Sequence, residues 1–233
     1  MCTFTFLPTK EGFIATSNRD ESPSRNTVFP KKYIENNTTL HYPKDALAGG
    51  TWIGLSSKKR LVCLLNGGFT THTRKETYKM SRGIVVKDVL CANSDIKVLE
   101  EYDFNGVEPF TLLTINWSNS LQLLEIVWDG TTKHFSKKPN KPQIWSSSLL
   151  YSQDVKQKRR DWFSLFLTKN ENPTSNELLD FHKSAGDGDI KTNLVMDRGF
   201  VKTKSITQVE KNGTTISMLY EDIGIKKTTL LSI

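Results

Sequence analysis

The chain has 233 residues, 36% of them hydrophobic, and a formal net charge of +7. A chain of this length buries enough apolar surface to fold without disulfides or a metal, so we expect a single domain over residues 1–233. No segment has the ~20 apolar residues that a membrane span requires and no signal-peptide pattern opens the sequence, so we expect a cytoplasmic protein.

Hydrophobic periodicity and turn residues predict the following elements in chain order. They are strands at 2–7 and 12–17, a polar loop at 22–48, strands at 52–55 and 61–65, helices at 81–92 and 95–102, strands at 110–115, 121–128, 132–135 and 143–146, helices at 152–168 and 174–184, a loop at 185–193, and strands at 204–209, 214–220 and 228–232. Strands and helix pairs alternate in blocks, unlike the repeated βαβ order of a parallel sheet. This order predicts an α+β layered sandwich of antiparallel sheets covered by helix pairs.

Basic residues are spread thinly along the chain, and the densest group is KQKRR at 156–160. This group begins an amphipathic helix, so we interpret it as a solvated helix face. No nucleic-acid-binding motif accompanies it, and we expect no nucleic-acid partner.

The three cysteines, Cys2, Cys63 and Cys91, and the four histidines lie far apart, without metal-ligand spacing. We therefore expect no metal and no cofactor. Cys63 and Cys91 lie in apolar segments and are predicted to be buried thiols. Cys2 is a different case, because the turn at 10–12 forms a hairpin that brings residues 17–21 (SNRDE) back toward it.

An N-terminal cysteine can act as its own acid–base pair. If Met1 is removed, the α-amine of Cys2, with a pKa of about 7.7–8.0, can take the proton from its thiol. Asp20 would orient this amine, and the charge of Arg19 would favour the thiolate. Asn66, which ends a predicted strand before two glycines, would donate to an oxyanion.

Each of these features also has a plain structural reading. A cysteine at position 2 can be incidental, and Arg19 and Asp20 can form a surface ion pair worth at most ~1 kcal/mol. Asn66 and Gly67 can form an ordinary turn. The conjunction of Cys2, the hairpin and SNRDE is what favours a reactive site.

Four features, in this order, resemble the NRDE family, which is also called the transport and Golgi organisation family. They are the initial MC, NRDE at 18–21, GGTWIG at 49–54, and Asn66 after an apolar strand. Arg82-Gly83, SSSLL at 146–150 and KTKSI at 202–206 also fall where that family has motifs. The resemblance implies a four-layer αββα sandwich of the N-terminal-nucleophile hydrolase type.

The first strands are also similar to those of conjugated bile acid hydrolases and penicillin V acylases. This similarity implies that Cys2 is the nucleophile, that Asn18, Arg19 and Asp20 support it, and that Asn66 belongs to the oxyanion region. The chain departs from these enzymes in two ways: its Arg and Asp are adjacent, and Ser147 stands where an asparagine is expected. Residues implied to contact the substrate are Glu21, Trp52, Gly67 and Lys202, the last in place of a late arginine.

Two functions remain open on these grounds. The first is hydrolysis of a small or acyl-bearing amide through Cys2. The second is non-catalytic binding or trafficking of an amphiphile such as haem or acyl-coenzyme A, with the thiolate of Cys2 available to haem iron. A redox sensor at Cys2 is a third reading, but it lacks a neighbouring cysteine in the sequence. The sequence does not indicate an oligomeric state.

Overall fold

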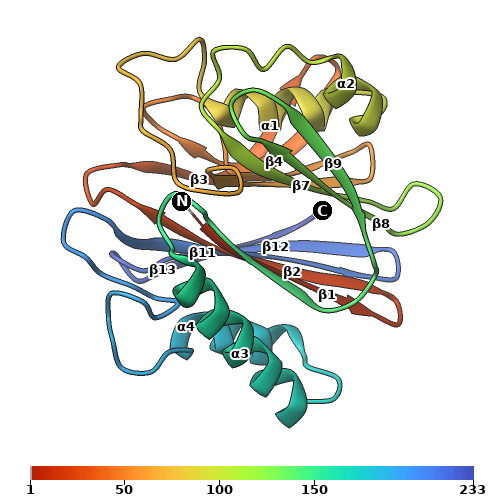
Figure 1. The fold of residues 1–233 in the computed structure, drawn as a ribbon. Helices are drawn as coiled ribbons and strands as arrows, with labels where there is room; N and C mark the ends of the chain where they lie inside the picture. The colour runs from red at the N-terminus through yellow and green to blue at the C-terminus, as the bar shows by residue number, and fades with distance from the viewer. Residues whose placement is uncertain (1) are drawn as a thin grey trace. The chain divides into compact units, whose positions relative to one another are not determined.

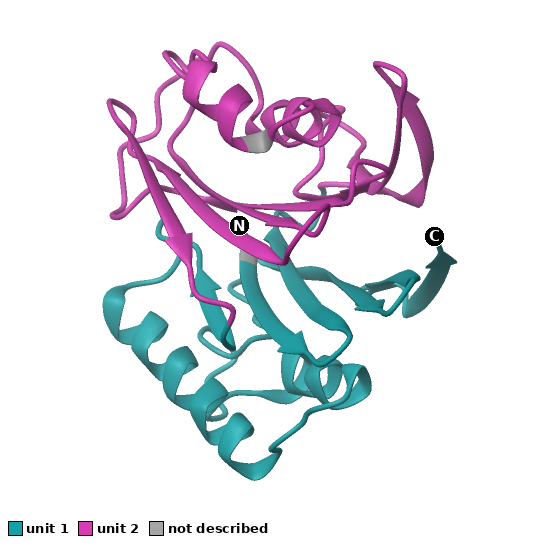
Figure 2. Ribbon diagram, turned by 90° about the vertical axis from the view of Figure 1, so that its right-hand side faces the viewer, with its two compact units in different colours: residues 1–24, 141–233 teal, residues 25–140 magenta. Residues whose placement is uncertain are grey.

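The computed structural model describes residues 2–233, without the side chains of Cys2 and Asp95 (Figure 1). The chain divides into two compact units, residues 1–24 with 141–233 (unit 1) and residues 25–140 (unit 2) (Figure 2). Each unit has its own antiparallel sheet and its own pair of helices. The single domain expected over residues 1–233 stays a prediction.

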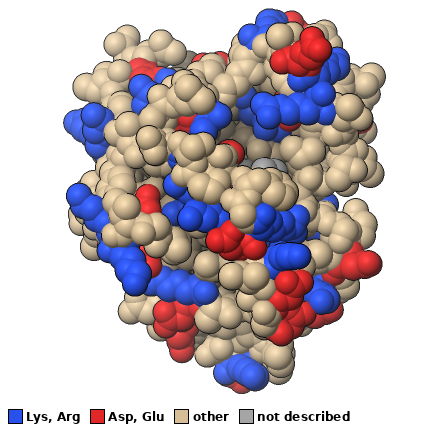
Figure 3. Space-filling view, turned by 90° about the vertical axis from the view of Figure 1, so that its left-hand side faces the viewer, with Lys and Arg blue, Asp and Glu red and all other residues tan. Residues whose placement is uncertain are grey.

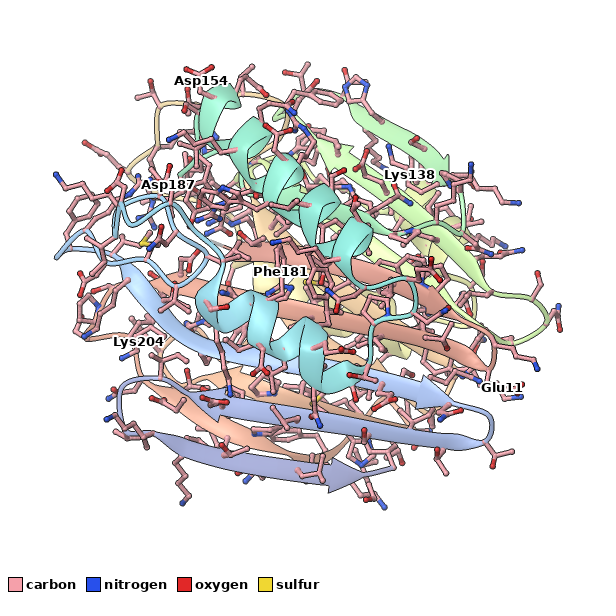
Figure 4. All side chains as sticks on the ribbon, turned by 90° about the horizontal axis from the view of Figure 1, so that it is seen from below. Glu11, Lys138, Asp154, Phe181, Asp187 and Lys204 are labelled. Carbon is pink, nitrogen blue, oxygen red and sulfur yellow. The ribbon has the colours of Figure 1, made fainter. Side chains whose placement is uncertain are left out.

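Unit 1 is a six-stranded antiparallel sheet with two helices on one face. Its strands, in spatial order, are β10 (Gln143–Ser146), β1 (Cys2–Thr9), β2 (Gly12–Glu21), β11 (Lys202–Asn212), β12 (Thr215–Asp222) and β13 (Lys227–Ser232). Helices α3 (Gln153–Lys169) and α4 (Ser175–Ser184) cross the strands, as Figure 4 shows. Phe181 of α4 packs against Phe163 and Phe166 of α3, with ring centroids 5.5 and 4.9 Å apart.

Unit 2 is a seven-stranded antiparallel sheet. Its strands, in spatial order, are β3 (Thr27–Glu35), β4 (Thr38–Asp45), β5 (Ile53–Ser56), β6 (Arg60–Asn66), β7 (Phe110–Asn116), β8 (Gln122–Trp128) and β9 (Lys133–Lys138). Helix α1 (Arg82–Cys91) packs on it through Val86, Val89 and Leu90, and α2 (Asp95–Glu101) follows. Cys63 is buried as predicted, whereas Cys91 is half-buried at the edge of this core.

The predicted helices are confirmed to within two residues, and their caps explain where they begin. Ser94 accepts a hydrogen bond from the backbone of Lys97, and Ser152 accepts one from Val155. Thr174 and Glu177 form a reciprocal capping box at the start of α4. None of the described helices has the length and apolar character needed to cross a lipid bilayer.

The polar loop predicted at 22–48 is wrong, because this segment contains β3 and β4. Asn36 and Asn37 both have positive φ, 47° and 57°, which suits a tight hairpin turn between two antiparallel strands. Pro30 lies in the edge strand β3, where the register shifts between Val28 and Lys31. A proline is tolerated at such a position, so it does not end the strand.

The end predicted for the second strand, at residue 17, is also wrong. Strand β2 continues to Glu21, so the NRDE residues lie inside the sheet. Because successive side chains of a strand point to opposite faces, Arg19 and Asp20 point away from each other. This alternation organises the candidate site described below.

Two glycines let α1 approach the segment that precedes β5. A Cβ on Gly83 would lie 2.8 Å from the backbone nitrogen and oxygen of Thr51, and one on Gly50 would lie 2.6 Å from the carbonyl carbon of Gly83. The backbone of Thr51 also donates to the carbonyl of Gly83 at 3.3 Å. The motifs GGTWIG and Arg82-Gly83 thus meet backbone to backbone, which explains the need for glycine at positions 50 and 83.

Gly83→Ala is expected to lower the free energy of unfolding by about 1–3 kcal/mol, because the added Cβ meets backbone that cannot yield locally. Helix propensity alone predicts the opposite sign, since alanine is the better helix former. Urea unfolding measures the change. Gly224→Ala is the matched control, since its Cβ would meet the Asp222 side chain at an ordinary 3.4 Å. Equal unfolding midpoints for the two variants would contradict this prediction.

Candidate active site

Strand register aligns four residues in a row across the unit 1 sheet. Cys2 of β1 pairs with Arg19 of β2, and Arg19 pairs with Ser205 of β11. On the other side of β1, Thr3 pairs with Ser146, so Ser147 continues that register at the level of Cys2. Residues paired across strands share a face, so Arg19 and Ser205 lie on one face of the sheet, in register with the backbone of Cys2.

The described members of this row are buried and polar. Arg19 is 3% exposed, and Ser147 and Ser205 are also buried. Among the described atoms, the Oγ of Ser205 has no hydrogen-bond partner. A buried hydroxyl without a protein partner is suited to bonding a water or a ligand. The predicted nucleophile itself, the thiol of Cys2, lies outside the described side chains.

Asn18 lies on the opposite face, the face that α3 and α4 cover. Its amide nitrogen donates to the carbonyls of Leu194 at 2.9 Å and His182 at 3.1 Å. Its amide oxygen is 2.6 Å from Nδ1 of His182, while Nε2 of His182 is 2.7 Å from the hydroxyl of Thr5. Asn18 therefore joins β2 to α4 and to the loop that follows it.

This hydrogen bonding defines the state of His182. Because the amide oxygen of Asn18 can only accept, Nδ1 carries the proton and Nε2 accepts from Thr5. Burial, with the nearby charge of Arg159 acting in the same direction, lowers the pKa of His182 to about 3. His182 is thus neutral, and both of its ring nitrogens are occupied.

Asp20 also lies on the helix-covered face and is fully buried. Its carboxylate accepts hydrogen bonds from the hydroxyl of Tyr151 at 2.5 Å and from that of Thr203 at 2.7 Å. Burial raises the pKa of Asp20, and the positive charge of Arg159 is the largest effect opposing that rise. The sequence predicts that the carboxyl of Asp20 orients the α-amine of Cys2. In the structure this carboxyl belongs to a group of buried polar residues on the helix-covered face, the helix-side polar layer, which includes Asn18, Tyr151 and His182.

The remaining predicted site residues fall in two places. Glu21 of β2 pairs with Lys202 of β11 in unit 1, one position beyond the Asp20–Thr203 pair. Asn66, Gly67 and Trp52 belong to unit 2. The contribution of these five residues to a site at Cys2 stays a prediction.

Gly67 has a clear local role in unit 2. Its φ of +90° is one that glycine adopts without strain. Its nitrogen donates to the carbonyl of Pro109 at 3.0 Å, and its own carbonyl accepts from the hydroxyl of Thr111 at 3.1 Å. These bonds fix the chain direction directly after Asn66, the last residue of β6.

Sequence reasoning missed Tyr151, Arg159, His182 and Ser205. Arg159 was assigned to a solvated face of α3, and that assignment is wrong, because the side chain is fully buried. Its spacing was a usable signal. Arg159 lies four residues after Val155 and four before Phe163, on the stripe of α3 that faces inward.

The basic residues do not all gather in one area. On the part of the surface that Figure 3 draws, Lys and Arg side chains lie among Asp and Glu side chains. Among the described residues, no three His, Cys, Asp or Glu side chains are grouped as metal ligands would be.

The family model for transport and Golgi organisation 2 matches residues 1–214. The chain belongs to this family. No curated protein was found that matches it in sequence. The resemblance to the NRDE family, which is also called the transport and Golgi organisation family, is therefore confirmed.

Solved structures reveal the fold of this transport and Golgi organisation 2 family member. A mutant conjugated bile acid hydrolase from Clostridium perfringens is 10% identical, with a TM-score of 0.65 over 100% of this chain and 92% of that one. Penicillin V acylase from Agrobacterium tumefaciens is 10% identical, with a TM-score of 0.63 over 100% and 86%. The N-acylethanolamine-hydrolyzing acid amidase orthologue of Caenorhabditis elegans is 11% identical, with a TM-score of 0.61 over 89% and 92%. The fold is the predicted α+β fold of the N-terminal-nucleophile hydrolases.

Proposed function

We propose that this protein hydrolyses the amide bond of a small, non-peptide or acyl-bearing substrate, with Cys2 as an N-terminal nucleophile. The observation that carries the proposal is the strand register that pairs Cys2 with Arg19. The likeness in fold to a bile acid hydrolase, an acylase and an acid amidase supports the same reaction class.

The proposed reaction begins in a chain whose first residue is Cys2. The α-amine takes the thiol proton, and the thiolate forms a C–S bond to the substrate carbonyl carbon. When the tetrahedral intermediate collapses, the C–N bond breaks and the ammonium gives its proton to the leaving amine. Water then attacks the thioester, with the α-amine as base, and releases the acid and the free thiol.

Arg19 and Asp20 would divide the electrostatic work between the two faces of β2. The guanidinium of Arg19, on the Cys2 face, would stabilise the thiolate. Arg19 is the residue of β2 that pairs with Cys2, and Asp20 is the next residue of β2. Asp20 would therefore lie beside the first residue of a chain that begins at Cys2. A carboxylate there would hold the α-amine by a charge-assisted hydrogen bond.

Two donors would stabilise the oxyanion. We assign this role to Ser147, in the row with Cys2, and to Asn66 of unit 2. Loss of one such donor costs about 10²–10³ in turnover. Glu21, Trp52, Gly67 and Lys202 would contact the rest of the substrate.

Intact-mass analysis combined with a thiol-directed acylating probe tests the proposal. Chains that lack Met1 are expected to form a stable adduct, and peptide mapping is expected to find it on Cys2. Cys63 and Cys91 serve as internal controls, because they are buried and half-buried. If, in chains that begin at Cys2, the probe forms adducts on Cys2 no faster than on Cys91, the assignment of Cys2 as the nucleophile would be refuted. Full retention of Met1 in active material would refute the amine as base.

The second candidate function is non-catalytic binding or trafficking of an amphiphile such as haem or acyl-coenzyme A. The word transport in the name of the family favours it. Both ring nitrogens of His182 are already bonded, and the axial ligand proposed for haem iron is the thiolate of Cys2. Titration with haem and with a long-chain acyl-coenzyme A tests this function. A saturable change in absorbance or in tryptophan fluorescence is expected if it is correct. Its absence for both ligands would exclude it.

A further inference from the structure

Arg159 is a fully buried cation beneath the candidate site. It lies on α3, and its guanidinium donates to the hydroxyl of Thr3, the residue next to Cys2. It also donates to the carbonyl of Asn193 at 2.6 Å and to that of Thr192 at 3.0 Å. Burying an arginine is costly unless its donors are satisfied, and here β1 and the loop after α4 satisfy them.

Tyr151 connects this cation to Asp20. The guanidinium carbon of Arg159 lies 3.7 Å from the centroid of the Tyr151 ring, a stacked cation–π contact. The hydroxyl of the same ring donates to the carboxylate of Asp20 at 2.5 Å. One side chain therefore contacts both the buried cation and the buried carboxyl.

Thr203 fixes the second carboxylate oxygen of Asp20. Its hydroxyl lies 2.7 Å from that oxygen and accepts from the backbone nitrogen of Met196 at 2.9 Å. Because Thr203 pairs with Asp20 across β2 and β11, the carboxylate is held from within the sheet as well as from the helix side.

Burial raises the pKa of Asp20, while the charge of Arg159 and the hydrogen bonds from Tyr151 and Thr203 oppose that rise. Arg159 comes from α3, and Arg198, whose guanidinium lies 5.4 Å from the Tyr151 ring centroid, comes from the loop before β11. His182 of α4 is neutral, and burial together with the Asp20 charge raises the pKa of Tyr151 well above its usual value. Burial is the largest of the effects on Asp20, and it favours the protonated acid.

We propose that Arg159 and Tyr151 are positioning residues for the reaction of Cys2. Arg159 holds Thr3 at the start of β1 and, through Tyr151, fixes the position of the Asp20 carboxyl relative to the α-amine of a chain that begins at Cys2. Neither residue touches the substrate. This inference rests on the proposed function, because it needs the amine of Cys2 to act as base.

The consequence is an acidic limit to the reaction. When Asp20 takes up a proton, it no longer attracts the ammonium that must give its proton to the leaving group. Removing the charge of Arg159, or the hydrogen bond of Tyr151, removes an effect that lowers the pKa of Asp20. Each change therefore moves this limit to higher pH.

The experiment is the pH profile of the rate at which the acylating probe labels Cys2. In Arg159→Met the acidic limb is expected to move up by about one pH unit, a tenfold loss on that limb that disappears at the alkaline plateau. Tyr151→Phe should move it in the same direction by less, and Arg159→Lys should restore part of the shift. Arg160→Met is the matched control, because Arg160 is exposed on the same helix and bonds Gln157.

The outcomes separate this inference from the function on which it rests. If Cys2 of the unsubstituted protein is not labelled, the proposed function fails. If Cys2 is labelled but Arg159→Met and Tyr151→Phe lose rate equally at every pH, the two residues are merely structural and the inference is overturned. Thermal unfolding shows which variants are folded. If Arg159→Met does not fold, Tyr151→Phe, which keeps the ring against Arg159, decides the question alone.

Discussion

The free energy of unfolding is expected to include a contribution from His182 that falls by about 1.4 kcal/mol for each pH unit below 6.5. Burial lowers the folded-state pKa of His182 to about 3, while the unfolded chain protonates near 6.5. Between these values the unfolded state binds more protons, so acid favours unfolding. The whole window is worth roughly 5 kcal/mol, a large part of a typical stability of 5–15 kcal/mol.

Asp20 acts in the opposite direction and must be separated from His182. Burial raises its folded-state pKa, so the ionised form costs stability at neutral pH and that cost is relieved as the carboxyl protonates. A single pH curve therefore mixes the two groups. The difference between the parent protein and a His182 variant isolates the histidine.

Urea unfolding of His182→Gln against the parent protein, from pH 7.5 to pH 4.5, measures this contribution. At pH 7.5 the variant should be less stable by about 1–3 kcal/mol, because it leaves buried partners such as Thr5 unpaired. The gap should then narrow by about 1.4 kcal/mol per pH unit below 6.5. His134→Gln, at an exposed histidine of β9, is the control. Parallel curves for His182→Gln and the parent would show that His182 is not held neutral.

Local sequence patterns predicted most elements because their signals are local. Helices α3 and α4 were found from amphipathic spacing and caps such as Ser152 and Thr174. The hairpin that carries Cys2 and NRDE was found from its turn, and a hairpin register brings residue 2 opposite residue 19. The row on the Cys2 face was within reach of the sequence for this reason. The sequence analysis predicted that NRDE returns toward Cys2, but it ended the second strand at residue 17, four residues before the end of β2. It therefore did not place Arg19 inside the sheet.

The helix-side polar layer was out of reach because its contacts are distant along the chain. Asn18 meets His182 across 164 positions, and Arg159 meets Thr3 across 156. A buried arginine and a solvated one are the same letter in a sequence, and only the apolar neighbours of Arg159 on α3 distinguish them. Ser205 illustrates the same limit, since a bulge between Thr203 and Ser205 decides which face it joins.

Arg19→Met is expected to lower the rate of Cys2 acylation about 30-fold at pH 7. A thiol without a nearby cation has a pKa of about 8.5, so only about 3% of it is thiolate at pH 7. The buried guanidinium of Arg19, paired with Cys2 in the sheet, would convert most of the thiol to thiolate. Methionine keeps much of the arginine volume and removes the charge, so the loss reports the electrostatic effect.

The pH dependence of that loss distinguishes an electrostatic role of Arg19 from a structural one. As pH rises toward 9.5 the thiol of Arg19→Met ionises without help, so its labelling rate should approach that of the parent protein. Arg19→Lys should lose less at pH 7, because it keeps a positive charge. Arg160→Met should match the parent at every pH. A deficit that stays 30-fold from pH 7 to pH 9.5 would mean that Arg19 holds the strands in place, and the thiolate would then need another source of positive potential on the Cys2 face of the sheet.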